Sequence, residues 1–483
     1  MLTRNAESSL TEQLSARFAQ RIRDRLLAPG ARLPSVRQCA QAQGVSPSTV
    51  VAAYDQLLAQ GLVEARKNRG FFVRDHRLNL QQKVPFRQHG KDNHAIENVA
   101  NGLPASPTAS ASTLIRGMFH GHGDRPQPGM GVFPPDWLDS PFMAAAVRRV
   151  MGTQNLRALS LQYGEPAGDA GLRRALAARL QAWHVPATPQ QIITTVGATH
   201  ALDIISRTLL RPGDPVMVEE PGWAIEFARL QALGMRILPV PRGADGPDLD
   251  VMARYCEAHA PKLFVSVSVL HNPTGHSLGP GAAHRVLQLA AAHDFHIVED
   301  DTYSHIAPDH ATRLSALDGL QRTLYVSGFA KVLAPNWRVG FMAVPQPWVE
   351  RLIDTKLLAT LTTPALLEQA MAVCIEQGHL RRHVERLRTR LGLARDRSVK
   401  LALGAGCRFV AEPAGLFGWV DTGVDTDALS QRMLDAGTLL APGSLFHAAR
   451  RPSTLMRINF ATTQDAAFWK LFVRLRDAQR SAR

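Results

Sequence analysis

The side chain with the clearest chemical potential in this sequence is Lys331, which stands between two apolar runs at residues 324–326 and 339–344. A lysine buried between strands costs free energy unless it is paired or used chemically. Desolvation lowers the pKa of a lysine, as a Schiff-base lysine requires. Arg338 follows and suits two-pronged contacts with phosphate oxygens. A loop lysine is more often simply solvated, so its interpretation depends on the rest of the chain.

Polar and aromatic side chains follow three other apolar runs. Asn272 supplies an amide, Asp300 a carboxylate, Tyr303 a phenol and Trp223 a flat ring for stacking. Each alone has an ordinary explanation as a turn, a helix cap or a core ring. Together with Lys331 they favour a pyridoxal phosphate site, in which Asp300 keeps the pyridine nitrogen protonated.

A phosphate would be held where residues 195–200 leave a strand and open a helix. The free N–H groups of a helix start favour an anion, and here they belong to Gly197, Ala198 and Thr199. Arg338 would complete this anchor, although an arginine there could also be a surface ion pair.

The elements that must position these residues alternate from about residue 131 onward. Strand-like runs occur at residues 191–195, 215–219, 236–240, 262–267, 296–299, 324–326 and 339–344, and helix-like runs at 198–210, 281–293 and 348–361. This alternation predicts an α/β domain built on a mostly parallel sheet. Functional side chains at such a sheet gather after the carboxyl ends of the strands, where the polar residues above fall.

Composition indicates a globular protein of two or three domains. The chain has 483 residues, of which 45% are hydrophobic and 20% charged, and its formal net charge is +14. The positive balance permits a polyanionic partner. Four scattered cysteines indicate reduced thiols rather than disulfides or zinc. Without a signal core or a long apolar run, we expect a cytoplasmic protein that spans no membrane.

The first 75 residues have the order of a winged helix-turn-helix. An apolar residue recurs every fourth position from Leu10 to Leu26, a second helix starts near Val36, and Ser46-Pro47 caps a third. Two short strands at 62–65 and 71–73 flank a basic turn. That turn carries Arg66, Lys67, Arg69 and Gly70, and the 75 residues hold 11 Lys+Arg against 6 Asp+Glu. The order suits DNA, with the third helix in the major groove and the wing on phosphates. A small helical packing domain is the alternative.

This N-terminal segment resembles the GntR family of bacterial repressors. The resemblance is carried by residues 33–37, 44–50, Tyr54, Leu57, 61–63 and 69–73. It implies that Arg37, Ser48 and Thr49 lie at the DNA surface beside Ser46, with Arg66, Lys67, Arg69 and Gly70 in the wing. Pro47 departs from the polar residue that the family often has there, which leaves base specificity open.

A linker is expected at residues 76–130, where Gly, Pro, Ser, His and Gln are frequent and apolar periodicity is weak. His76, His89, His94, His120 and His122 fit no metal-ligand spacing, so we expect solvated loop histidines and no metal site.

From about residue 131 to the end, the order of motifs resembles the fold-type I aminotransferases, which bind pyridoxal phosphate. The resemblance implies that Lys331 forms the Schiff base and that Asp300 pairs with the pyridine nitrogen. It makes Tyr303 and Asn272 the partners of the ring oxygen and Trp223 the stacking ring.

The same resemblance assigns the phosphate and carboxylate contacts. Arg338 and the backbone of Gly197, Ala198 and Thr199 become the phosphate anchor. Tyr163 matches a tyrosine that reaches the phosphate of a neighbouring subunit, which implies a homodimer. Arg457 matches the arginine that holds a substrate carboxylate. The chain departs from the family at Gly328 and Ala330, where hydroxyl side chains usually bind the phosphate, and Ser327 is a candidate replacement.

A GntR-like head on an aminotransferase-like body is the arrangement of the MocR subgroup of transcription regulators. We expect a winged helix-turn-helix domain at residues 8–75, the linker, and a fold-type I domain at 131–483, whose small α+β subdomain begins near residue 390. The resemblance implies a regulator that binds operator DNA and pyridoxal phosphate and responds to the cofactor or an amino compound. A working aminotransferase with an accessory head, and a regulator that has lost the cofactor, remain alternatives.

Overall fold

The computed structural model describes residues 9–23, 27, 30–66, 69–74 and 127–481. The chain divides into two compact units, with the division between Gly121 and His122. The first is therefore described from Ser9 to Arg74 and the second from Gln127 to Ser481. Most of the linker expected at 76–130, including its five histidines, lies outside the described residues.

The first unit has the expected helix, helix, helix, hairpin order. Its elements are α1 (Leu10–Arg23), α2 (Val36–Gln43), α3 (Pro47–Ala59), β1 (Val63–Arg66) and β2 (Gly70–Val73), and β1 pairs antiparallel with β2. Leu14, Phe18, Val50 and Leu57 form a small core around the buried ring of Tyr54. The apolar spacing that predicted the helices is thus the face that packs.

The second unit is built on a seven-stranded sheet. Its strands are β3 (Ile192–Val196), β4 (Pro215–Glu220), β5 (Arg236–Pro241), β6 (Leu263–Ser266), β7 (His296–Asp300), β8 (Thr323–Gly328) and β9 (Val339–Ala343). They lie in the order β3-β9-β8-β7-β6-β4-β5, and only β9 runs antiparallel to its neighbours. The mostly parallel sheet and each expected strand are confirmed.

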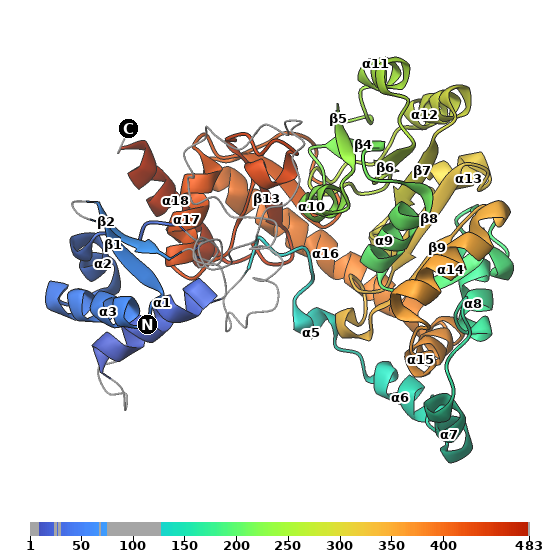
Figure 1. The fold of residues 1–483 in the computed structure, drawn as a ribbon, viewed down its shortest axis with the longest axis horizontal. Helices are drawn as coiled ribbons and strands as arrows, with labels where there is room; N and C mark the ends of the chain where they lie inside the picture. The colour runs from blue at the N-terminus through green and yellow to red at the C-terminus, as the bar shows by residue number, and fades with distance from the viewer. Residues whose placement is uncertain (1–8, 24–26, 28–29, 67–68, 75–126, 482–483) are drawn as a thin grey trace, which may run out of the picture. The chain divides into compact units, whose positions relative to one another are not determined.

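Helices cover both faces of this sheet (Figure 1). Along β4, Val216 and Val218 enter one core cluster whereas Met217 enters another, because successive side chains of a strand point to opposite faces. The first cluster packs under α9 (Ala198–Leu209), α10 (Ala224–Ala232) and α14 (Val349–Thr360). The second packs under α11 (Leu249–His259), α12 (Pro280–His293) and α13 (Leu314–Asp318).

The C-terminal part forms a smaller α+β layer. Four strands lie in the order β10-β11-β13-β12, and their bounds are Arg408–Phe409, Phe417–Asp421, Leu455–Asn459 and Ala441–Pro442 in that order. Helices α17 (Thr426–Asp435) and α18 (Ala466–Arg480) pack on one another beside it. The boundary expected near residue 390 falls inside one continuous helix, α16 (His379–Gly404), so no break in the chain marks it.

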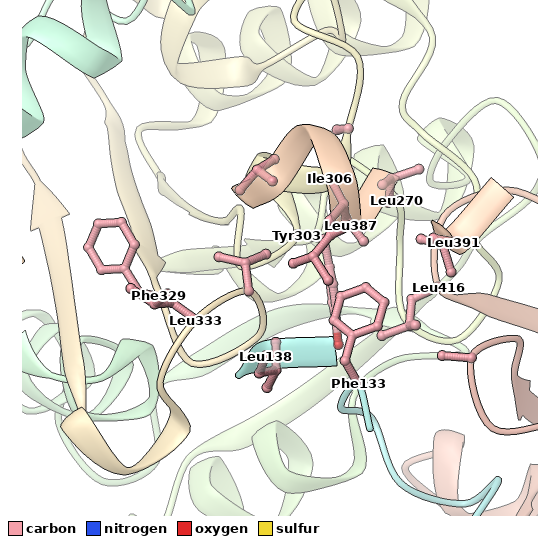
Figure 2. Close-up of a cluster of buried hydrophobic side chains, with 14 of the residues drawn as sticks. Phe133, Leu138, Leu270, Tyr303, Ile306, Phe329, Leu333, Leu387, Leu391 and Leu416 are labelled. Atoms are coloured by element: carbon pink, nitrogen blue, oxygen red, sulfur yellow. The ribbon is translucent and has the colours of Figure 1, made fainter. Parts of the chain in front are cut away.

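Of the remaining helices, four precede the sheet in the chain and one follows it. They are α5 (Pro135–Leu138), α6 (Pro141–Val150), α7 (Thr153–Leu161), α8 (Ala170–Gln181) and α15 (Ala365–Glu376). Short 3-10 turns complete the unit at Pro189–Gln191, Ser304–Ile306, Pro335–Trp337, Gln346–Trp348 and Gly443–Phe446. Figure 2 shows Phe133, Tyr303 and Leu416 in one apolar cluster with Leu387 and Leu391 of α16.

Candidate cofactor site and nucleic-acid interface

Lys331 lies just beyond the carboxyl end of β8, where the sequence predicts it. Its Nζ donates a hydrogen bond to the carbonyl oxygen of Gly131 at 2.9 Å. Burial, together with the smaller effect of the Arg457 and Arg338 charges, lowers the pKa of Lys331 to about 8, although the carboxylate of Asp300 works against this fall. The amine is therefore partly unprotonated near neutral pH, which makes it a competent nucleophile toward an aldehyde.

Asp300 ends β7, the strand next to β8. Its Oδ1 accepts hydrogen bonds from the backbone N–H of Thr302 at 3.2 Å and from the Thr302 hydroxyl. Burial raises the pKa of Asp300 to about 6, although the hydrogen bonds from Thr302 work against the rise. Such a carboxyl can share a proton with a basic ring nitrogen at neutral pH.

Tyr303 follows Asp300 in the same loop and is buried. Its ring meets that of Phe417 edge-on, with centroids 5.4 Å apart. Burial raises the pKa of the phenol. Tyr303 therefore remains a neutral donor beside Arg457, whose charge acts on it.

Arg457 and Asn272 come together from distant parts of the chain. Nη1 of Arg457 donates to Oδ1 of Asn272 at 2.8 Å, and Nη2 donates to the carbonyl oxygen of Gly129 at 2.6 Å. The guanidinium lies 4.4 Å from the centroid of the Phe417 ring. Burial lowers the pKa of Arg457 to about 10.

This arginine carries an uncompensated buried charge. Arg457 is only 6% exposed and its Nε has no hydrogen-bond partner among the described residues. Both of its hydrogen-bond acceptors are neutral, and no carboxylate among the described residues lies within ion-pair distance of it. A buried guanidinium with neutral partners is a site for an anion, because a carboxylate would repay its desolvation.

The residues expected to anchor a phosphate lie together at the start of α9. Gly197 has φ +77°, a conformation that favours glycine, and a Cβ there would lie 2.4 Å from Nη2 of Arg338. Arg338 also donates to the carbonyl of Val196 at 3.1 Å. Ala198 and Thr199 begin the helix, whose first amides have no intrahelical acceptors. The first backbone amides of α9 and the guanidinium of Arg338 thus lie close together.

The departure at Gly328 has a packing reason. A Cβ at Gly328 would lie 3.2 Å from Cα of Gly340 and from the carbonyl oxygen of Val339. Strands β8 and β9 therefore lie close together there, and a larger side chain at this position would have to shift β9 by a few tenths of an ångström. Ser327 is fully buried, and its hydroxyl donates to the carbonyl of Asp301 at 2.9 Å. The structure does not bring Ser327 to the anchor.

Two predicted residues lie at the margins of the cluster. Trp223 precedes α10, is half-buried and packs against the core cluster beneath that helix. Glu226 of α10 is near enough to Asp300 to contribute to raising its pKa. Tyr163 is 81% exposed, so within one chain it is not brought to Lys331.

Several contributing residues were not found from the sequence. Thr302 could have been, since a threonine two residues after a strand-end aspartate is a local capping pattern. Gly129 could not, because residues 76–130 were assigned to the linker, and Gly131 could not, because it contributes only a backbone carbonyl. Among the described residues, no group of three or more His, Cys, Asp and Glu is placed to hold a metal.

A buried polar network supports the loop that carries Asn272. Glu219 of β4 pairs with Arg242 and accepts from the Ser266 hydroxyl at 2.9 Å. His271 lies 3.4 Å from Glu219, and its Nδ1 is 2.9 Å from the hydroxyl of Thr274. These contacts fix His271 and Thr274, the residues that flank Asn272 in its loop.

The first unit presents its predicted contacts on α2 and α3. Arg37 and Ser48 are exposed. Ser46 caps α3 by accepting from the Thr49 N–H at 3.1 Å, and its hydroxyl also lies 2.8 Å from that of Thr49. The Ser46 hydroxyl also lies 2.7 Å from that of Ser48, so all three hydroxyls order the helix start, while the side chains of Ser48 and Arg37 remain exposed.

The wing is partly preorganised. Arg66 bonds Glu64 at 2.8 Å and lies 4.5 Å from the centroid of the Phe72 ring. Arg69 and Gly70 are exposed at the turn, whereas Lys67 lies outside the described residues. Arg32 was missed from the sequence, and a Cβ at Gly70 would lie 3.4 Å from its Nε. Arg32 thus adds a positive charge beside the wing.

Comparison with known proteins matches both parts. Residues 10–73 match the model of bacterial regulatory proteins of the gntR family, and residues 140–475 match that of aminotransferase class I and II. In the residues described, no helix is long and apolar enough to cross a membrane.

Similar proteins fall into two groups. The chain is 26% identical over 463 residues to the uncharacterized HTH-type transcriptional regulator YisV of Bacillus subtilis, covering 94% of this chain and 93% of that one. It is 26% identical to the HTH-type transcriptional regulator TauR of Rhodobacter capsulatus, covering 99% and 98%. It is 28% identical to a 2-aminoadipate transaminase of Thermus thermophilus, covering 69% and 84%.

Solved structures agree on the fold of the larger unit. The α-aminoadipate aminotransferase LysN of Thermus thermophilus superposes with a TM-score of 0.70 at 24% identity, covering 77% of this chain and 96% of that one. The larger unit is thus a fold-type I, aminotransferase-like domain, preceded by a winged helix-turn-helix of the GntR type. The chain belongs to the aminotransferase class I and II family, joined at its N-terminus to a GntR-family domain.

Proposed function

We propose that this protein is a DNA-binding transcription regulator that holds pyridoxal phosphate on Lys331 and responds to an amino compound. One observation carries the proposal. A half-buried amine with a pKa of about 8 stands near Asp300 and the uncompensated Arg457, in a chain that also has a GntR-type head. Full-length relatives named as HTH-type regulators support the regulatory role.

The residues present fit pyridoxal phosphate. Arg338 and the start of α9 would hold the phosphate, and the close approach of Gly197 to Arg338 leaves the helix amides open to it. Asp300 would hold the proton of the ring nitrogen. Asn272 and Tyr303 would bond the ring oxygen. When bound, this group supplies an electron sink to the amino compound attached to it.

The amino compound is expected to carry a carboxylate. Arg457 is buried and charged, and among the described residues it has only neutral partners. A carboxylate would accept two parallel hydrogen bonds from such a guanidinium. An amino acid provides both the amine and the carboxylate.

We further propose a homodimer. Tyr163 is 81% exposed, Leu161 71% and Leu358 92%, although all are large and apolar in part. The segments that follow α7 and α14 are neighbours, since a Cβ at Gly164 would lie 3.2 Å from the carbonyl oxygen of Thr363. Exposed apolar side chains near such neighbouring segments are typical of a subunit contact.

The test is made on the purified full-length protein with added pyridoxal phosphate. We expect an absorbance band of the lysine-bound cofactor that is absent in Lys331→Ala. We also expect binding to DNA upstream of its own or a neighbouring gene, weakened by salt and by Arg37→Ala. A protein that gains no band yet binds DNA would favour a regulator without cofactor, the reading prompted by Gly328 and Ala330.

A working aminotransferase is the second candidate. The observation that favours it is the presence of Arg457 together with Asn272, Asp300 and Tyr303 around Lys331, since a carboxylate-binding arginine exceeds what holding the cofactor needs. Turnover of amino acids with a keto acid at about 1 per second or faster would place the protein among ordinary enzymes. Turnover slower than that by several orders of magnitude, together with sequence-selective DNA binding, would favour the regulator.

A further inference from the structure

Residues 127–132, which we name the strap, run into the site beside Lys331. They are the first described residues after the GntR-type unit in the chain. The carbonyl oxygen of Gly131 accepts from Nζ of Lys331 at 2.9 Å, and that of Gly129 accepts from Nη2 of Arg457 at 2.6 Å. The strap thereby occupies both cationic side chains on which the proposed ligand depends.

The strap is otherwise held by the small C-terminal layer. Oε1 of Gln127 accepts from the Leu439 N–H at 2.9 Å, and the Gly129 N–H donates to the Leu439 carbonyl at 2.8 Å. Nδ2 of Asn459 donates to the carbonyls of Met130 at 2.9 Å and Val132 at 2.7 Å. Phe133 then enters the apolar cluster with Tyr303 (Figure 2). The strap is thus fixed at both ends, and between them its backbone carbonyls contact Lys331 and Arg457.

Of the two glycines of the strap, only Gly129 is required by this close fit. A Cβ at Gly129 would lie 2.6 Å from the carbonyl carbon of Leu440. A Cβ at Gly131 would lie 3.4 Å from the Phe417 ring and 3.6 Å from Nη1 of Arg457. A larger residue at Gly129 would push its carbonyl away from Arg457.

The two carbonyls are replaceable partners. Each is a neutral acceptor on a buried cation, whereas a carboxylate brings a full opposite charge and a stronger, charge-assisted hydrogen bond. Condensation of the Lys331 amine with an aldehyde forms a carbon–nitrogen double bond and releases the aldehyde oxygen as water. That nitrogen then retains at most one N–H, where the protonated amine had three.

We propose that the strap is an internal ligand of the site, which an amino acid displaces from Arg457 and the cofactor displaces from Lys331. Binding of a ligand in the site thereby releases the strap, which connects in sequence to the DNA-binding unit. Such a ligand shifts the equilibrium between bound and released strap because it competes with one state only. This inference rests on the proposed function and specifies how that site is regulated.

The test uses full-length protein and three probes in hydrogen–deuterium exchange. Pyridoxamine phosphate can neither bond Lys331 nor place a carboxylate on Arg457. Pyridoxal phosphate bonds Lys331 but brings no carboxylate to Arg457. N-(5'-phosphopyridoxyl)-L-leucine has no aldehyde to bond Lys331, but it places a carboxylate on Arg457. We expect the Gly129 and Met130 amides to exchange at least about tenfold faster with the leucine adduct, which competes with Gly129 for Arg457, than with pyridoxamine phosphate. With pyridoxal phosphate, which competes with Gly131 for Lys331, they should also exchange faster than with pyridoxamine phosphate. Equal exchange with all three probes would overturn the inference.

A matched pair of variants tests the competition. Asn459→Asp places a carboxylate against the Met130 and Val132 carbonyls and should tighten binding of the leucine adduct about fivefold to tenfold, since two strap hydrogen bonds are lost. Gln479→Glu makes the same change where Nε2 donates to the Asp425 carbonyl at 2.9 Å, and should leave that affinity unchanged. Gln127→Leu loosens the other end of the strap and should act as Asn459→Asp does.

The outcomes separate the two proposals. Weaker adduct binding in both strap variants would mean that the strap helps to hold the ligand, and the inference would be wrong. If pyridoxal phosphate gives its band and DNA is bound while strap exchange does not respond, only the strap inference fails. Absence of any pyridoxal phosphate binding at Lys331 would remove the proposed function as well.

Discussion

Replacement of Lys331 by methionine should stabilise the cofactor-free protein at pH 7. The pKa of Lys331 falls from 10.5 to about 8, so protonating it in the folded state costs about 3 kcal/mol at about 1.4 kcal/mol per unit. Methionine forgoes the hydrogen bond to Gly131, which is worth about 1 kcal/mol. Because solvent reaches part of the half-buried side chain, we expect a net gain of about 1–2 kcal/mol.

The pH dependence gives this prediction its sign. The folded-state pKa lies below the unfolded one, so the cost is present in full below about pH 8 and disappears as the pH rises toward 10.5. The advantage of Lys331→Met should therefore shrink to under about 1 kcal/mol at pH 10. Denaturant unfolding of the larger unit, followed in the full chain at both pH values, measures it. Lower stability of the variant at pH 7, or a gain unchanged at pH 10, would refute the reasoning.

Lys356 offers a matched control. Burial also lowers its pKa to about 8, but its Nζ donates to the Pro166 carbonyl at 2.8 Å and lies 3.4 Å from the Thr363 hydroxyl and 3.5 Å from that of Thr194. Lys356→Met would remove the donor to the Pro166 carbonyl, at about 1–3 kcal/mol for a group left unsatisfied, whereas the Thr194 and Thr363 hydroxyls still bond each other. We expect no gain at pH 7, so the comparison separates a lysine kept for structure from one kept for chemistry.

Three further predictions concern ligands. Gly197→Ala puts a Cβ 2.4 Å from Nη2 of Arg338 and should weaken pyridoxal phosphate binding at least about tenfold in absorbance titrations. Gly328→Ser should not tighten pyridoxal phosphate binding, because its Cβ would lie 3.2 Å from β9. Ala330→Ser changes a half-buried position and should tighten this binding about threefold. Tighter binding in Gly328→Ser than in Ala330→Ser would contradict the packing argument. Arg69→Ala should weaken DNA binding at low salt and reduce the slope of log affinity against log salt by about one, unless the wing makes no phosphate contact.

Local pattern was enough to predict most of the fold. Each strand of the large sheet was expected within a few residues of its place, because a strand buried on both faces reads as a short apolar run. The rule that functional loops follow the carboxyl ends of parallel strands then brought Asp300 and Lys331 together from β7 and β8, which are paired in the sheet. In the first unit, Ser46 was expected as a cap and is one.

Other expectations depended on side-chain direction. Ser327 was a candidate phosphate ligand, but the hydroxyl points to the Asp301 carbonyl, because neighbouring residues of a strand face opposite sides. The glycine at position 328 was interpreted as the loss of a phosphate ligand, whereas the structure shows that Gly340 of the paired strand approaches it closely. Neither fact is encoded in the residues next to them.

The sequence by itself determined the two families of motif, the order of strands along the chain and the residues with chemical capacity, since these depend on residue type and short spacing. Only the tertiary structure decided that Gly131 faces Lys331 and Gly129 faces Arg457, contacts that join residues 200 and 328 positions apart. Such pairings arise where separate layers pack, and a glycine in a loop-like stretch carries no local sign of its distant partner.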